Sequence, residues 1–172
     1  MKALTVDCEL IAQSMRDVCR ETNEYFFQKP TGRVISISRT LMRALAERSG
    51  DVREMVPDWE QPMIPLAREI VVTGSSEYVR IPEVFGRPEH KWMLEFSGTV
   101  RGAKLKEKLT ISLKGRESCQ RFKELLKDHA EELNRWSVFR CRKWEEVVQI
   151  WLEGHGILAV GAKSSKRRQQ AA

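Results

Sequence analysis

The sequence predicts an α+β fold that is predominantly α-helical, with a small antiparallel β element ahead of a helical C-terminal half. Three observations predict it. Aromatic and β-branched residues flank a Pro-Thr-Gly turn in YFFQKPTGRVISI, residues 25–37. From residue 88 onward, apolar residues recur at three- and four-residue steps, which is the helical period. Hydrophobic residues make up 41% of the 172 positions, which is enough for an ordinary core.

The N-terminal segment, residues 4–20, is predicted to form a helix. Its apolar side chains follow the helical period, at Leu4, Cys8, Ile11, Met15, Val18 and Cys19. Cys8 and Cys19 are interpreted as small buried thiols.

The β element is predicted as a hairpin over 24–37 and a short strand near 77–81. Proline sets the hairpin turn and glycine supplies a positive φ there. Pro82 ends the short strand because proline has no N–H for a ladder hydrogen bond. Ser38 can cap a helix over 39–48 that Gly50 closes. Residues 67–71 fit either a helix or a strand.

The C-terminal half is predicted to hold helices over 117–128, about 130–137 and about 141–153. The first of these places apolar side chains on one face, namely Cys119, Phe122, Leu125 and Leu126. Later aromatic residues are expected in the core because of their helical spacing, namely Trp136, Phe139, Trp144 and Trp151. Together these helices are expected to form most of the core.

The chain is predicted to form one compact domain over 1–157, and division into 1–86 and 87–157 is the alternative. Residues 158–172 form a polar, basic tail that is predicted to be disordered. No segment resembles a signal peptide or a membrane span, and the four cysteines lack zinc-ligand spacing. The chain is therefore expected to be cytoplasmic, with reduced thiols and no membrane contact.

The positive charge is concentrated in the second half of the chain. Residues 1–86 hold 11 Lys and Arg against 13 Asp and Glu, a net charge of −2. Residues 87–172 hold 19 against 11, a net charge of +8. This asymmetry is compatible with an anionic partner, either nucleic acid or an acidic protein surface. A basic domain without an anionic ligand is the alternative.

The basic residues on and around the last helices are the candidate anion-binding or nucleic-acid-binding site. They are Arg121, Lys123, Arg135, Arg140, Arg142, Lys143, Lys166, Arg167 and Arg168. No nucleophile elbow, phosphate-binding loop or zinc-protease motif occurs, and the three histidines are scattered. No catalytic, cofactor-binding or metal-binding residue is assigned, and the sequence favours a binding protein over an enzyme.

Several short blocks, taken in order, resemble a widespread bacterial uncharacterised protein family of the UPF type. The blocks are YVRIP at 78–82, G-R-x-x-x-x-R-F-K-x-x-L at 115–126, W-x-x-F-R at 136–140 and W-L-E-x-x-G-I at 151–157. The resemblance implies a compact α+β protein with a helical C-terminal half, and it implies no established activity. Two positions depart from the family pattern. Cys119-Gln120 stands where members usually have Phe before the R-F-K block, and Cys141 stands where they usually have an acidic residue.

Three hypotheses about function follow. The first is a binding module that contacts an anionic partner through the basic C-terminal half. The second is a protein–protein interaction or regulatory protein that uses an apolar groove or the exposed edge of its sheet. The third is an enzyme with a dispersed site. The sequence does not specify an oligomeric state.

Overall fold

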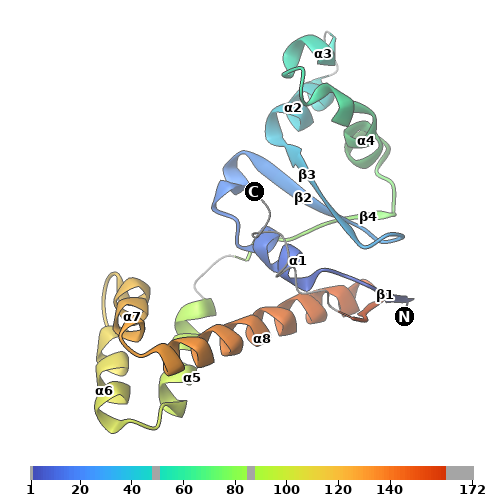
Figure 1. Ribbon diagram of the computed structural model, residues 1–172. Helices are drawn as coiled ribbons and strands as arrows, with labels where there is room; N and C mark the ends of the chain where they lie inside the picture. The colour runs from blue at the N-terminus through green and yellow to red at the C-terminus, as the bar shows by residue number, and fades with distance from the viewer. Residues whose placement is uncertain (1, 48–50, 85–87, 162–172) are drawn as a thin grey trace, which may run out of the picture. The chain divides into compact units, whose positions relative to one another are not determined.

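The computed structural model describes residues 2–47, 51–84 and 88–161, which form two compact units (Figure 1). The first, which we call the sheet unit, comprises the described residues up to Val84 and those from Val148 onward. The second, the helical unit, comprises the described residues between them, through Val147. The single domain over 1–157 stays a prediction of the sequence.

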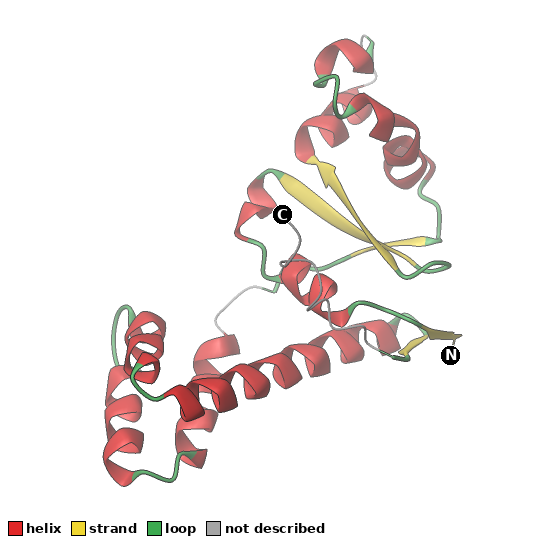
Figure 2. Cartoon of the chain, viewed as in Figure 1, coloured by secondary structure: helices red, strands yellow, loops and turns green. Residues whose placement is uncertain are grey.

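The sheet unit contains both sheets of the protein's described part (Figure 2). Its strands are β1 (Lys2–Leu4), β2 (Asn23–Gln28), β3 (Arg33–Ser38), β4 (Tyr78–Arg80) and β5 (Ile157–Ala159). Its helices are α1 (Cys8–Met15), η1 (Val18–Glu21), α2 (Arg39–Glu47), α3 (Val52–Met55), η2 (Gln61–Met63), α4 (Ile64–Arg68) and η3 (Glu69–Thr73). β1 and β5 pair in parallel, and the other three strands form an antiparallel sheet in the order β3-β2-β4. The predicted α+β class, mainly α-helical, is confirmed.

The predicted hairpin is confirmed as β2 and β3, and the short strand as β4. The Gly32 N–H donates to the Gln28 carbonyl (2.8 Å) and closes the turn. The Ser38 hydroxyl accepts from the Leu41 N–H (3.0 Å), which confirms the predicted cap of α2. Gly50, the predicted end of that helix, lies outside the described residues. Residues 67–71, whose sequence fits either a helix or a strand, are helical in α4 and η3.

The sheet carries an apolar cluster on one face. Phe26 and Ile37 project from β2 and β3 against Leu41 and Leu45 of α2 and Ala67 of α4. The next residue of β2 projects to the opposite face because side chains alternate along a strand. There the ring of Phe27 meets Trp151 of α8 edge-on, with 5.8 Å between ring centroids. α8 runs from Ala130 to Gly154, and its residues from Val148 onward belong to this unit.

The predicted helix over 4–20 is wrong at both ends. Leu4 belongs to β1, where it pairs with Ala159 of β5. α1 begins only after Asp7, whose carboxylate accepts from the Leu10 N–H (3.0 Å) as an N-cap. The helix ends at Met15, and a 3₁₀ turn, η1, follows. Cys8 is buried as expected, whereas the side chain of Cys19 lies outside the described part of the structure.

The helical unit consists of α5 (Pro88–Thr99), α6 (Ala103–Ser112), α7 (Ser118–Lys127) and α8 up to Val147. α7 confirms the helix predicted over 117–128. The two helices predicted near 130–137 and 141–153 are instead one continuous helix. No glycine or proline interrupts it before Gly154, and Trp136, Trp144 and Val148 keep one buried face.

An aromatic cluster forms the core of the helical unit. Phe96 of α5 packs against Phe122 of α7, Trp136 and Phe139 of α8, with centroid distances of 5.4–6.3 Å. Trp92 and Trp144 meet edge-on at 5.2 Å. Phe122, Leu126 and Trp136 are buried as expected. Trp144 is also buried as expected, whereas Cys119, Leu125 and Phe139 are half-buried.

Gly32 provides a test of the packing at the hairpin turn. Its φ is +73°, and a Cβ there would lie 2.9 Å from the Thr5 carbonyl oxygen. Gly74 has a similar φ of +64°, but a Cβ there would meet nothing within 4 Å. We expect Gly74→Ala to lower the free energy of unfolding by about 1–2 kcal/mol, the cost of the left-handed conformation alone.

Gly32→Ala is expected to cost at least about 1 kcal/mol more, because a backbone atom must also move. Urea unfolding of both variants, followed by circular dichroism, measures the difference. Equal losses in the two variants would show that the turn does not pack against Thr5.

Candidate functional site

β3 forms one edge of the three-stranded sheet, and part of its backbone faces away from the sheet. The Arg39 N–H donates to the Thr22 carbonyl (2.8 Å), directly opposite it in the β2–β3 register. Hydrogen-bonded pairs alternate along antiparallel strands, so Ile37 and Ile35 also direct their N–H and C=O groups toward β2. The N–H and C=O groups of Val34 and Ser36 therefore point outward. Among the described residues, no strand lies on that side of β3.

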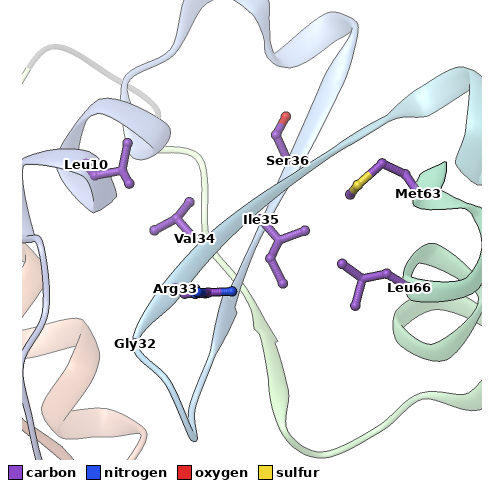
Figure 3. Close-up of a pocket in the computed structure, with 8 residues that line it drawn as sticks. All are labelled: Leu10, Gly32, Arg33, Val34, Ile35, Ser36, Met63 and Leu66. Carbon is purple, nitrogen blue, oxygen red and sulfur yellow. The ribbon is translucent and has the colours of Figure 1, made fainter. Parts of the chain in front are cut away.

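A groove of about 530 Å³ follows this edge (Figure 3). Val34 lies on the side of Leu10 of α1, and Ile35 lies on the side of Met63 and Leu66. Gly32, Arg33 and Ser36 complete the lining. The edge strand thus has an apolar side chain from a neighbouring helix on each of its two faces.

The walls of the groove are held in place by different parts of the sheet unit. Ile35, Met63 and Leu66 pack at the margin of the apolar cluster on one sheet face. Leu10 is 43% exposed, although it lies on a helix whose other face is buried. The position of this leucine beside Val34 extends the apolar surface across the edge.

Arg33 adds a positive charge at one end of the groove. Its side chain is exposed and pairs with no carboxylate among the described residues. A carboxylate in the groove would therefore find a cation there. Outward backbone groups, apolar side chains on alternate faces and a terminal cation together match what an added β-strand needs.

The structure places six of the predicted anion-binding residues in the helical unit, and three of those are paired with carboxylates. Arg140 contacts Glu89 through two nitrogens (2.6 and 2.7 Å). Lys143 contacts Glu95 (2.9 Å) and lies over the ring of Phe139.

Arg135, the third paired residue, contacts Glu132 (2.7 Å), and its guanidinium lies over the ring of Phe96. These pairings reduce the charge that the three residues can offer to a ligand.

The remaining predicted residues differ from these. Arg121 is exposed and donates to the Lys114 carbonyl (2.6 Å). Lys123 and Arg142 are exposed and pair with no carboxylate in the described part of the chain. The three tail residues of the prediction lie outside the described residues; they are Lys166, Arg167 and Arg168.

Glu89 is a half-buried acid of α5 whose carboxylate receives two hydrogen bonds from α8. Burial opposes its ionisation, but hydrogen bonds from Arg140 and from the Trp144 indole outweigh burial and hold the pKa of Glu89 below its ordinary value. A charge-assisted hydrogen bond of this kind is stronger than a neutral one. Arg140 is therefore interpreted as a structural residue that anchors α8 to α5.

Sequence reasoning named a sheet edge as a binding surface but missed the groove residues. Leu10, Met63 and Leu66 come from separate segments, and nothing local marks them as neighbours of β3. Leu10 carried a signal, because it is a large apolar residue off the buried face of α1. Pro62 and Pro65, which flank Met63, start the short helical turns that carry the other wall.

Within the described ranges, no helix is long and apolar enough to cross a bilayer. Over the same residues, no cluster of His, Cys, Asp and Glu is arranged to hold a metal ion.

Fold and groove define an α+β protein whose three-stranded sheet has β3 at one edge, with no further strand beside it among the described residues. The model of the uncharacterised protein family UPF0158 matches residues 50–170, and the chain belongs to this family. A search of the curated proteins found no match, and neither did a search of the solved structures.

Proposed function

We propose that this protein is a protein-binding module that receives an extended segment of a partner along β3. The observation that carries the proposal is the groove on the edge strand, where outward backbone groups lie between two apolar walls. Main-chain hydrogen bonds to Val34 and Ser36 would supply affinity, and the walls would select the side chains. The proposed occupant has apolar side chains at alternate positions and a carboxylate that pairs with Arg33.

The backbone N–H of Ser36 allows a sharp test. It points away from β2, so Ser36→Pro removes a hydrogen-bond donor to the partner and leaves the β2–β3 ladder intact. Ser36→Thr keeps both the N–H and a hydroxyl, and is the matched control. A random peptide library displayed on phage supplies the probes, and fluorescence anisotropy measures their affinities.

We expect selected peptides to show alternating apolar residues and an acidic residue, and to bind the Pro variant about tenfold more weakly than the Thr variant. Arg33→Gln should weaken the acidic peptides alone. Thermal unfolding checks that both Ser36 variants fold. Equal peptide affinity for the two variants, or self-association through β3 in sedimentation, would overturn the proposal.

A second candidate function, contact with nucleic acid through the helical unit, is supported by charge. The described residues 88–147 hold 14 Lys and Arg against 10 Asp and Glu. Four of these basic residues are exposed and form no ion pair with a carboxylate of the described residues. They are Lys104 and Lys108 of α6, Lys123 and Arg142. Such cations release counterions when they neutralise phosphates, so binding would weaken log-linearly with salt.

Anisotropy of labelled random RNA and DNA across a salt series tests this candidate. Charge reversal at Lys123 and Arg142 should abolish binding, whereas reversal at Arg43 of the sheet unit should not. A truncation after residue 160 separates a surface of the helical unit from the basic tail. Absence of binding at low salt would exclude this candidate and leave the groove.

A further inference from the structure

Three arginines converge on one buried carboxylate in the sheet unit. Glu24 of β2 is 3% exposed. Its carboxylate contacts Arg20 of η1 (3.3 Å), Arg39 at the start of α2 (2.6 Å) and Arg80 of β4 (2.6 Å). One negative charge therefore faces three positive charges. The charge of Glu83 also acts on Arg80 and offsets part of the excess.

The three arginines have different surroundings. Arg20 is 3% exposed and also donates to the carbonyls of Ser14 (3.0 Å) and Ile81 (2.9 Å). Its donors are directed into the protein, so its role is to hold η1 against β4. Arg39 and Arg80 keep 46% and 63% of their side chains exposed. These two guanidinium groups are open to a ligand.

Arg39 and Arg80 are held side by side with donors to spare. In each, one Nη is 2.6 Å from the same oxygen, Oε1 of Glu24, so these two nitrogens lie within twice that distance of each other. The Nε of Arg39 donates to the Arg20 carbonyl (2.9 Å), and the Nε of Arg80 donates to Glu24 (2.8 Å). Each guanidinium retains its second terminal nitrogen, which makes no hydrogen bond to the described residues.

We propose that Arg39 and Arg80 bind a dianionic phosphate group. Two adjacent guanidinium groups match the tetrahedral oxygens of phosphate, and the excess of positive charge around Glu24 favours an anion there. Arg39 is also the first residue of α2, and the positive end of the helix dipole favours an anion there. Glu24 fixes both side chains in advance, which lowers the entropy lost on binding.

Isothermal titration calorimetry of the full chain with inorganic phosphate and with phenyl phosphate tests the proposal. At pH 8 a phosphate monoester is a dianion, because its second pKa is about 6. We expect Arg39→Gln and Arg80→Gln each to weaken binding about tenfold or more. Arg43→Gln, an exposed arginine one turn further along α2, should leave binding unchanged. The proposal would be overturned if both Gln variants bound phosphate as tightly as wild type, or if wild type showed no binding at millimolar phosphate.

Two further measurements test whether the guanidinium shape matters and which kind of molecule carries the phosphate group. Arg39→Lys and Arg80→Lys retain the charge beside Glu24 but lose the planar fork, so folded Lys variants that still bind more weakly than wild type support the site. A phosphoserine peptide distinguishes the two sources of the group. Tighter binding of that peptide than of phenyl phosphate assigns the site to phosphorylated protein, and equal binding assigns it to small phosphate esters. Arg39→Gln should not change peptide binding at β3, so the two proposals fail independently.

Discussion

Replacing Glu24 by glutamine will lower the free energy of unfolding by about 3–5 kcal/mol, because it leaves a buried cation without its counter-charge. The cation is Arg20, whose side chain is 3% exposed and cannot reach solvent unless η1 moves. Removing one partner of a buried ion pair costs more than the pair itself contributes. Urea unfolding followed by circular dichroism measures the loss. The control is Glu21→Gln, which replaces an exposed acid on the same turn as Arg20, η1.

A double variant separates the charge from the shape of the site. If the unpaired Arg20 causes the loss, Arg20→Met combined with Glu24→Gln will cost less than the two single changes added together. Additive losses would show that the two side chains contribute by packing alone. A loss no larger than that of Glu21→Gln would show that the carboxylate is not needed for stability.

The same carboxylate makes stability depend on pH. Burial opposes ionisation of Glu24, but the hydrogen bond from Arg80 and the charges of Arg80, Arg39 and Arg20 outweigh it and hold its pKa below the ordinary 4.5. A carboxyl group whose pKa is lower in the folded state contributes stability above its unfolded pKa, and this contribution is lost as the pH falls through the folded pKa. Wild type should therefore lose stability below about pH 4.5, and Glu24→Gln should lose less over that range.

Elements with local signals were predicted well from the sequence. The hairpin follows from strand formers on both sides of a Pro-Thr-Gly turn, and the Ser38 cap follows from one side chain and its nearest N–H groups. β1 and β5 have no such signal. They are three-residue strands from opposite ends of the described chain, and only their pairing makes them strands.

The candidate sites show a similar division. The number of basic residues can be counted from the sequence. Arg140 and Glu89 are 51 positions apart, however, so their pairing depends on the tertiary structure. Glu24 reads as an ordinary polar position in a strand, and only the fold brings three arginines to it. The groove also depends on separate segments that meet across the edge of a sheet. The charge of a segment and its hydrophobic periodicity can be read from neighbouring residues. Ion pairs between distant residues and the shape of a groove cannot.

The second large effect is expected from Phe122→Ala, which should cost about 3–5 kcal/mol. Phe122 is fully buried, and its ring meets Trp136 at 5.2 Å and Phe96 at 6.3 Å. Truncation removes contacts among three helices and leaves a cavity, because rigid aromatic neighbours collapse only partly. Lys123→Ala, at the next position but exposed, is the control and should cost less than about 0.5 kcal/mol.

Comparison of the two losses also tests how the chain is divided. Glu24 lies in the sheet unit and Phe122 in the helical unit. If residues 1–157 form a single cooperative domain, each substitution will shift the same unfolding transition, seen alike by circular dichroism and by tryptophan fluorescence. If the units unfold separately, Phe122→Ala will shift one transition and Glu24→Gln the other. Three of the five tryptophans, Trp92, Trp136 and Trp144, lie in the helical unit, so tryptophan fluorescence weighs that unit more heavily than circular dichroism does.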